Sequence, residues 1–221
     1  GLSAAPIRKK DMALNINLNV AWQKNRLESL EGNYRGYTLT GPGAVPIGQL
    51  NGAGFHGGNN NIVYQIEGQS LGVFYLPHCT GLEKQADGTY RYAIEDLNGD
   101  GTGDADDRYI AGQATPKMTL GSNISFRYKN IDVSLQMNGA FGHKIYNGTA
   151  LTYMNMNSLP DYNVMADAPA RMITDQTATD YWLESGNYVH FDYLTLGWTP
   201  PLREGKLLKR IIDEVFRNYL P

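Results

Sequence analysis

The sequence predicts an all-β fold built from antiparallel strands. Two observations support this: long stretches in which apolar and polar residues alternate one by one, and two such stretches joined by about two turn residues. Strict alternation is typical of a strand with one apolar and one hydrated face, and a very short connection is typical of an antiparallel hairpin. The pattern alone leaves two architectures open, a transmembrane β-barrel and a soluble β-sandwich.

The first strand is expected at residues 13–22, ALNINLNVAW. Every even-numbered position from Leu14 to Trp22 is apolar, and asparagine occupies positions 15, 17 and 19. A length of about ten residues exceeds the usual five or six of strands in soluble proteins. It suits a tilted strand that crosses a membrane.

Two further regions alternate in the same way. Residues 118–141 predict two strands joined by a turn at Lys129 and Asn130. Residues 187–202 predict another strand, in which Leu194, Leu196 and Trp198 share a face before two prolines end it. Residues 61–68, NIVYQIEG, form a weaker candidate strand.

Long polar connections separate these strands, at residues 32–61, 76–117 and 147–181. Such lengths are uncommon inside compact soluble domains, whereas outer-membrane barrels combine short turns at one end with long loops at the other. The last segment, residues 202–221, changes pattern, because its apolar residues recur every three or four positions. It is expected to be an amphipathic helical tail, separate from the β-structure of residues 1–201.

The connection at residues 76–117 contains an acidic motif, DLNGDGTGDADD. Its spacing matches the calcium-loop template, with a glycine at the sixth position for the sharp turn. Position 12 holds aspartate instead of the usual glutamate, and no flanking helices are predicted, so a stand-alone loop is expected rather than an EF-hand pair. A hydrated acidic turn is the alternative. The candidate Ca²⁺ ligands are Asp96, Asn98, Asp100, Thr102, Asp104 and Asp107.

Other classes of function find little support in the sequence. The formal net charge of -3 gives no basic face for nucleic acid. The single cysteine excludes an internal disulfide and a multi-cysteine zinc site, and the four histidines show no ligand spacing. No nucleophile has a neighbouring histidine signature, so the chain is not expected to be an enzyme.

Four segments in order resemble the SusC/RagA family of TonB-dependent outer-membrane transporters. IEGQSLGVFY is similar to that family's E-G-x-x-[IL]-G-x-F-[YW] segment, and the acidic loop continues into a G-x-x-x-P-x-x-x-x-G pattern. MNGAFGHKIYN and YWLESGNYVHFDYLTLGWTPP match two more. Each segment alone is weak, but their order makes the resemblance specific. The four segments span residues 66–75, 96–121, 137–147 and 181–201.

The resemblance implies the C-terminal part of a 22-stranded, plugged barrel in the outer membrane of a Bacteroidetes-like bacterium. It also implies a SusD-like surface lipoprotein as partner, energy from TonB, and import of an oligosaccharide or a peptide. The sequence contains neither the family's plug nor the first half of its barrel, so this fragment is expected to be inactive alone. The alternative from a different class is a soluble, calcium-dependent β-sandwich that binds glycans.

In the barrel interpretation, the apolar positions of the strands contact membrane lipid. Polar residues such as Asn15, Asn17, Gln136 and Asn138 then face the barrel interior. Trp22 and Trp198 are expected in the aromatic girdle at the membrane interface, although stacking on a sugar ring is the other interpretation of these side chains.

Overall fold

The computed structural model describes residues 1–35, 37–39, 43–50 and 61–200. The helical tail expected at residues 202–221 lies outside the described residues. The chain divides into two compact units. Unit 1 comprises Gly1–Val20, Leu120–Gly139 and the residues from Val189 onward, and unit 2 comprises Ala21–Thr119 and Ala140–Tyr188.

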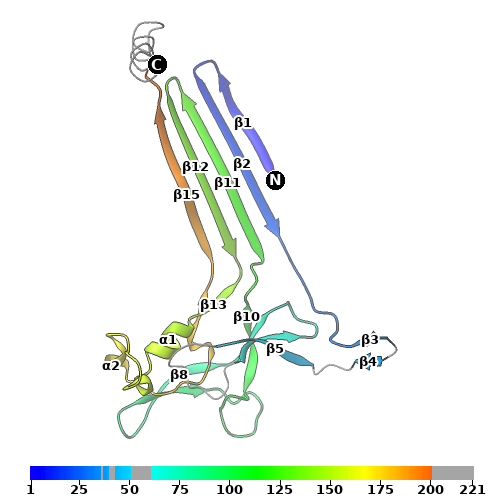
Figure 1. Cartoon of the computed structure of the whole chain (residues 1–221), viewed down its shortest axis with the longest axis vertical. Coiled ribbons are helices and arrows are strands. Elements are labelled where there is room, and N and C mark those ends of the chain that lie inside the picture. The colour runs from blue at the N-terminus through cyan, green and yellow to red at the C-terminus, as the bar shows by residue number, and fades with distance from the viewer. Residues whose placement is uncertain (36, 40–42, 51–60, 201–221) are drawn as a thin grey trace, which may run out of the picture. The chain divides into compact units, whose positions relative to one another are not determined.

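Unit 1 is built on one five-stranded sheet, whose strands run in alternating directions (Figure 1). Four of the strands have 11 residues each, the length expected for a membrane-crossing strand. The all-β, antiparallel fold class is confirmed, and the sheet is open rather than closed into a barrel. In spatial order, the strands are β1 (Leu2–Lys9), β2 (Met12–Trp22), β11 (Met118–Tyr128), β12 (Ile131–Phe141) and β15 (Tyr188–Trp198).

The turn between β11 and β12 lies at residues 129–130, as the sequence predicts. Lys129 adopts a left-handed conformation with φ 51°, and its backbone N–H donates to the carbonyl oxygen of Asp11 at 2.6 Å. Asp11 belongs to the turn between β1 and β2, so this hydrogen bond joins the two hairpins. Strand β1 was not predicted, because its sequence LSAAPIRK does not alternate strictly. Its pairing with β2 has a register shift between Ala4 and Ile7.

The alternation of side chains in β15 shifts by one residue near the middle of the strand. Asn138 donates to the Asp192 carboxylate at 2.6 Å, and Asn123 donates to the Tyr193 hydroxyl at 3.4 Å. Asn123 and Asn138 line the same hollow on one face of the sheet, so the neighbours Asp192 and Tyr193 both point to that face. Further along, Gly197 lies on this face too, since an added Cβ would approach the Asp132 carboxylate at 2.4 Å. Such a shift is the effect of a β-bulge, which places two successive residues on one side.

The shift keeps the other face of β15 apolar along its whole length. The sequence VHFDYLTLGW changes phase at Asp192–Tyr193, so the apolar residues before and after this point end on the same side. They are strongly exposed, from 50% for Val189 to 75% for Leu196. The apolar residues on this face of β15 are Val189, Phe191, Leu194, Leu196 and Trp198.

Unit 2 contains a four-stranded antiparallel sheet in the order β10-β7-β6-β5. These strands are β5 (Ala44–Gln49), β6 (Asn61–Ile66), β7 (Val73–Pro77) and β10 (Arg108–Gln113). The weak strand candidate at residues 61–68 therefore corresponds to β6. Three two-stranded sheets accompany it: β3 (Gly32–Tyr34) with β4 (Tyr37–Leu39), β8 (Cys79–Lys84) with β9 (Tyr90–Ile94), and β13 (Lys144–Tyr146) with β14 (Leu183–Ser185).

The long connections expected from the sequence contain regular structure. The region 76–117 holds β8, β9 and β10, whose short and partly polar sequences show no sustained alternation. The region 147–181 contains helical turns, beginning at Asn147, whose side chain accepts from the backbone N–H of Ala150. They are α1 (Gly148–Tyr153), η1 (Met156–Ser158), α2 (Ala168–Arg171) and η2 (Asp180–Trp182). No helix in the described residues has the length and apolar character needed to cross a membrane.

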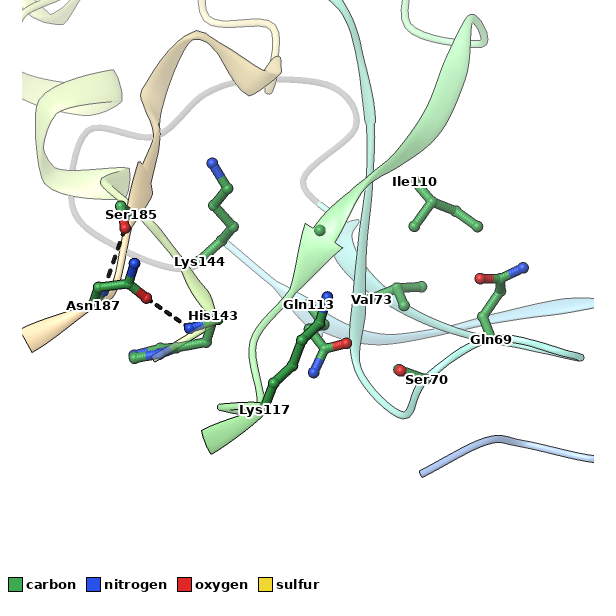
Figure 2. A pocket seen from close by; sticks show the side chains of 12 residues that line it. Gln69, Ser70, Val73, Ile110, Gln113, Lys117, His143, Lys144, Ser185 and Asn187 are labelled. Atoms are coloured by element: carbon green, nitrogen blue, oxygen red, sulfur yellow. Dashed lines mark hydrogen bonds between the residues drawn. The ribbon is translucent and has the colours of Figure 1, made fainter. Parts of the chain in front are cut away.

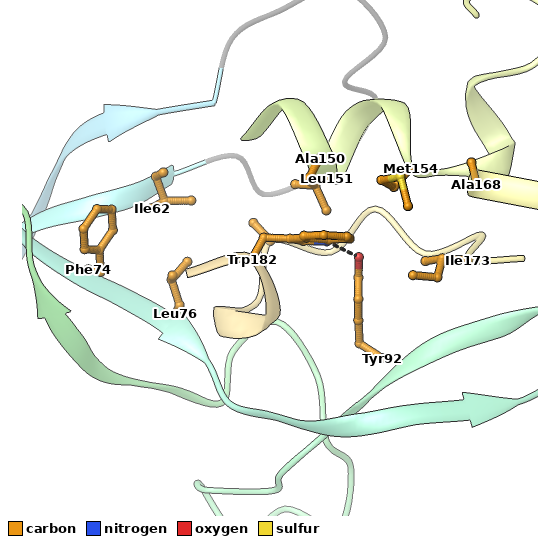
Figure 3. Packing of buried hydrophobic residues seen from close by; sticks show 11 residues of the cluster. Ile62, Phe74, Leu76, Tyr92, Ala150, Leu151, Met154, Ala168, Ile173 and Trp182 are labelled. Carbon is orange, nitrogen blue, oxygen red and sulfur yellow. Dashed lines mark hydrogen bonds between the residues drawn. The ribbon is translucent and has the colours of Figure 1, made fainter. Parts of the chain in front are cut away.

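The hydrophobic core lies in unit 2 (Figure 3). Leu76 is fully buried, and Trp182 donates its indole N–H to the hydroxyl of Tyr92 at 2.7 Å. This bond satisfies the one polar group that the indole carries into the core. Among the described residues of unit 1, by contrast, no apolar side chain is buried. The core cluster consists of Ile62, Phe74, Leu76, Tyr92, Ala150, Leu151, Met154, Ala168, Ile173, Ala178 and Trp182.

Candidate functional site

The acidic loop predicted as a calcium site connects β9 to β10 and is organised around Asp107. This side chain is 1% exposed, although the other five candidate ligands lie at the surface. Its Oδ1 accepts from the backbone N–H of Leu97 at 2.8 Å and of Asn98 at 2.9 Å, and its Oδ2 accepts from Asp104 at 2.9 Å. The amide of Asp104, followed by those of Asn98 and Leu97, stabilises the carboxylate and lowers the pKa of Asp107.

The exposed aspartate and asparagine side chains of the loop also accept backbone hydrogen bonds. Asp96 accepts from Gly99 at 2.7 Å and from Gly101 at 2.9 Å, so it spans the sharpest part of the turn. Asn98, Asp100 and Asp104 each accept from the amide two residues further along, at 2.8 Å. These are Asx-turns, which the short side chains of Asp and Asn form readily.

The described residues contain no group of three or more carboxylate, histidine or cysteine side chains placed to hold a metal ion. The oxygen-rich donor set of the loop nevertheless suits Ca²⁺ better than zinc. In this geometry the oxygens face backbone amides, and a bound cation would need several of them to turn inward. Calcium binding at Asp96, Asn98, Asp100, Thr102, Asp104 and Asp107 therefore stays a prediction.

If the loop binds Ca²⁺, calorimetric titration of the chain will give a heat of binding that saturates at one ion per molecule. Asp100→Ala with Asp104→Ala is expected to remove that heat, because two carboxylate ligands are lost. The double variant Asp161→Ala, Asp167→Ala removes two exposed carboxylates elsewhere in unit 2 and should titrate like the unmodified chain. Equal heats from the chain and the loop variant would contradict calcium binding by this loop.

The polar residues predicted to face a barrel interior do share one face of the unit 1 sheet. Asn15 donates to the hydroxyl of Ser125 at 3.3 Å, and Asn138 donates to Asp192 at 2.6 Å. A shallow hollow of about 220 Å³ lies on this polar face. Asp192 also lies 3.1 Å from Nδ1 of His190, so the carboxylate has two polar neighbours. The side chains around the hollow include Asn17, Asn19, Asn123, Gln136, Asn138 and Asp192.

Sequence reasoning missed a carboxylate that joins three segments of unit 2. Asp180 accepts from the Tyr109 hydroxyl and from the backbone N–H of Cys79, and it pairs with Nδ1 of His78, each at 2.7 Å. The hydrogen bond to Asp180 raises the pKa of His78. The partners are about 70 to 100 residues apart in sequence, so spacing gives no signal for this cluster.

Comparison with known proteins finds TonB-dependent receptors among the proteins that are similar to the chain. No family model matches the chain. The chain is 28% identical over 156 residues to TonB-dependent receptor P3 of Formosa agariphila, which covers 61% of the chain and 16% of the receptor. It is 23% identical over 207 residues to TonB-dependent receptor SusC of Bacteroides thetaiotaomicron, which covers 90% of the chain and 20% of that receptor.

Solved structures with the same fold come from the RagAB system. The RagAB peptide transporter superposes with a TM-score of 0.56 at 14% identity, over 88% of this chain and 21% of that one. The RagAB peptide importer in its open-open state gives 0.57 at 15% identity, with the same coverage. The chain thus has the fold of the matching part of these RagAB structures. The resemblance predicted from the four sequence segments is confirmed: the chain is similar to part of a TonB-dependent transporter of the SusC/RagA type.

Proposed function

We propose that the chain forms part of the barrel wall of a TonB-dependent outer-membrane importer of the SusC/RagA type. The chain spans 16% to 20% of the length of the two curated relatives, so an importing activity belongs to a larger assembly than this segment. The uncovered apolar face of the unit 1 sheet carries the proposal. Large exposed apolar surfaces are rare on soluble monomers and mark contact with a membrane or a partner.

The two unlike faces of the sheet suit the two environments of a barrel wall. Strands of 11 residues span the apolar layer of a membrane when tilted, and alternation turns one face to lipid and the other to water. Paired residues of β1 and β2, such as Leu2 with Leu18 and Ala4 with Ile16, extend the apolar face by another strand. The polar face with its hollow would then line the path of the solute.

Partners and solute follow from the same proposal. A SusD-like surface lipoprotein and TonB are the expected partners, and an oligosaccharide or a peptide is the expected solute. The similar RagAB structures are those of a peptide transporter, which favours a peptide as the solute. We expect no catalytic role for the chain, because the similar proteins are named as receptors.

Quenching of tryptophan fluorescence by brominated lipid tests the membrane placement. In the full-length protein reconstituted in vesicles, Trp198, which is 68% exposed on the apolar face, is expected to be strongly quenched. Trp182, which is 9% exposed in the core of unit 2, is expected to remain bright. Variants that retain one tryptophan of this chain at a time, in a background without other tryptophans, separate the two signals.

The outcome decides between the two classes of protein. Lipid quenching of Trp198 but not of Trp182 supports the barrel wall. Absence of quenching at Trp198, together with a chain that stays monomeric without detergent and binds glycans, would instead favour the soluble β-sandwich.

A further inference from the structure

A hollow of about 570 Å³ lies in unit 2, where the ends of several strands meet (Figure 2). Its wall is made by the turn between β6 and β7, the end of β10, the start of β13 and the end of β14. Side chains that can donate hydrogen bonds are prominent in it. They include Gln69, Gln113, Lys117, His143, Lys144 and Asn187.

Two glycines hold the stems of two lysines against the wall of this hollow. A Cβ added to Gly142, whose φ is +79°, would lie 2.9 Å from the Cβ of Lys117. A Cβ added to Gly112 would lie 2.8 Å from the Cγ of Lys144. The turn at Gly142 is fixed further by its N–H, which donates to the side-chain oxygen of Asn187 at 2.7 Å. The aliphatic stems are therefore packed, and the ammonium groups form the polar ends of these side chains.

Among the described residues, no acidic side chain balances the charge of these lysines. The lining of the hollow contains neither aspartate nor glutamate. Within the described part of the chain, neither Lys117 nor Lys144 has a carboxylate at ion-pairing distance. The chain as a whole has more acidic than basic residues, 22 against 19, so the local positive charge of the hollow is opposite in sign to the net charge of the chain.

A neighbouring hollow of about 450 Å³ extends the same surface. The two hollows share Ser70, Gln113 and Lys117, and the second adds Lys24 and the exposed ring of Trp22. Its lining is also free of carboxylates. Three lysines, several glutamine and asparagine side chains and one aromatic ring thus line the region formed by the two adjoining hollows.

We infer that this region binds an anionic group, a carboxylate, sulfate or phosphate, carried by the solute. Lysine ammonium groups supply the charge. The side-chain nitrogen of Gln113 already donates to the carbonyl oxygen of Thr115 at 2.7 Å, and its second N–H can add one neutral hydrogen bond. The inference rests on the proposed importer function and narrows its solute to an acidic oligosaccharide or an acidic peptide. A lipid headgroup carries the same phosphate chemistry, and the test separates it from the solute.

The test measures binding to the full-length protein in detergent by calorimetry. The probes are two soluble polyanions, hexagalacturonate and hexaglutamate, and one neutral sugar, maltohexaose. Lys117→Met with Lys144→Met retains the packed stems and removes both charges. We expect this variant to bind at least one polyanion about tenfold more weakly or worse. Lys10→Met with Lys84→Met removes two exposed lysines outside both hollows and should bind like the unmodified protein.

The outcomes separate this inference from the proposed function. Polyanion binding that depends on Lys117 and Lys144 and weakens with added salt supports it. Failure of both polyanions, or equal binding by the hollow variant, overturns it, and import of a neutral solute would then leave the importer function intact. A lysine-dependent interaction seen only with phosphatidylglycerol nanodiscs, and not with phosphatidylcholine, assigns the site to a lipid headgroup and overturns the solute assignment.

Discussion

Leu194→Arg is expected to destabilise the membrane-embedded protein by about 2–4 kcal/mol, the cost of placing a cation against the hydrocarbon near the middle of a transmembrane strand. Leu194 lies mid-strand in β15 and is 71% exposed on the apolar face. Thr195→Arg is the matched control, because the next side chain points to the polar face and should change the free energy of unfolding little. Urea unfolding of the full-length protein in lipid vesicles, followed by tryptophan fluorescence, gives both values.

The comparison also tests the phase shift at Asp192–Tyr193. Without a shift, Leu194 would share the face of Asp192, and arginine there would be tolerated while Thr195→Arg would be costly. A larger loss of stability for Thr195→Arg than for Leu194→Arg would show that the faces are assigned the wrong way round.

Leu76→Ala is expected to lower the free energy of unfolding of unit 2 by about 2–5 kcal/mol, because it removes a fully buried side chain and leaves a cavity. Leu76 is 0% exposed and belongs to the same cluster as Trp182. Chemical denaturation followed by the fluorescence of Trp182 reports on this core directly. Leu97→Ala, at a leucine that is 44% exposed in the acidic loop, is expected to stay within about 0.5 kcal/mol of the unmodified chain. Equal losses from the two variants would contradict the assignment of the core.

Four of the five strands of the unit 1 sheet could be predicted, because apolar and polar residues alternate along them. A long strand with one apolar face and one hydrated face must alternate, so β2, β11 and β12 stand out in the sequence. The phase shift in β15 is also visible in the order of residues, since apolar positions 189 and 191 are followed by 194, 196 and 198. A spacing of three residues between two apolar positions, in place of the usual two, is the sequence signature of such a shift.

The core of unit 2 could not be predicted in the same way. Its members come from short strands and single helical turns, and contacts such as Trp182 with Tyr92 join residues 90 positions apart. No local period marks them. The acidic loop illustrates a different difficulty, because alternating Asp and Asn at every second position suits both calcium ligation and Asx-turns. The spacing alone therefore does not distinguish a cation from backbone amides as the partner of these oxygens.

The location of the packed core has a consequence for how the protein assembles. Unit 2 carries its own buried cluster, so water alone can drive its collapse. In the proposed barrel wall, the sheet of unit 1 gains comparable stabilisation only when hydrocarbon replaces water on its apolar side. The folding of the two units would then depend on two different solvents. The choice of detergent or lipid should govern the folding of the sheet, and a denaturant acting from the aqueous phase should govern the folding of the remainder.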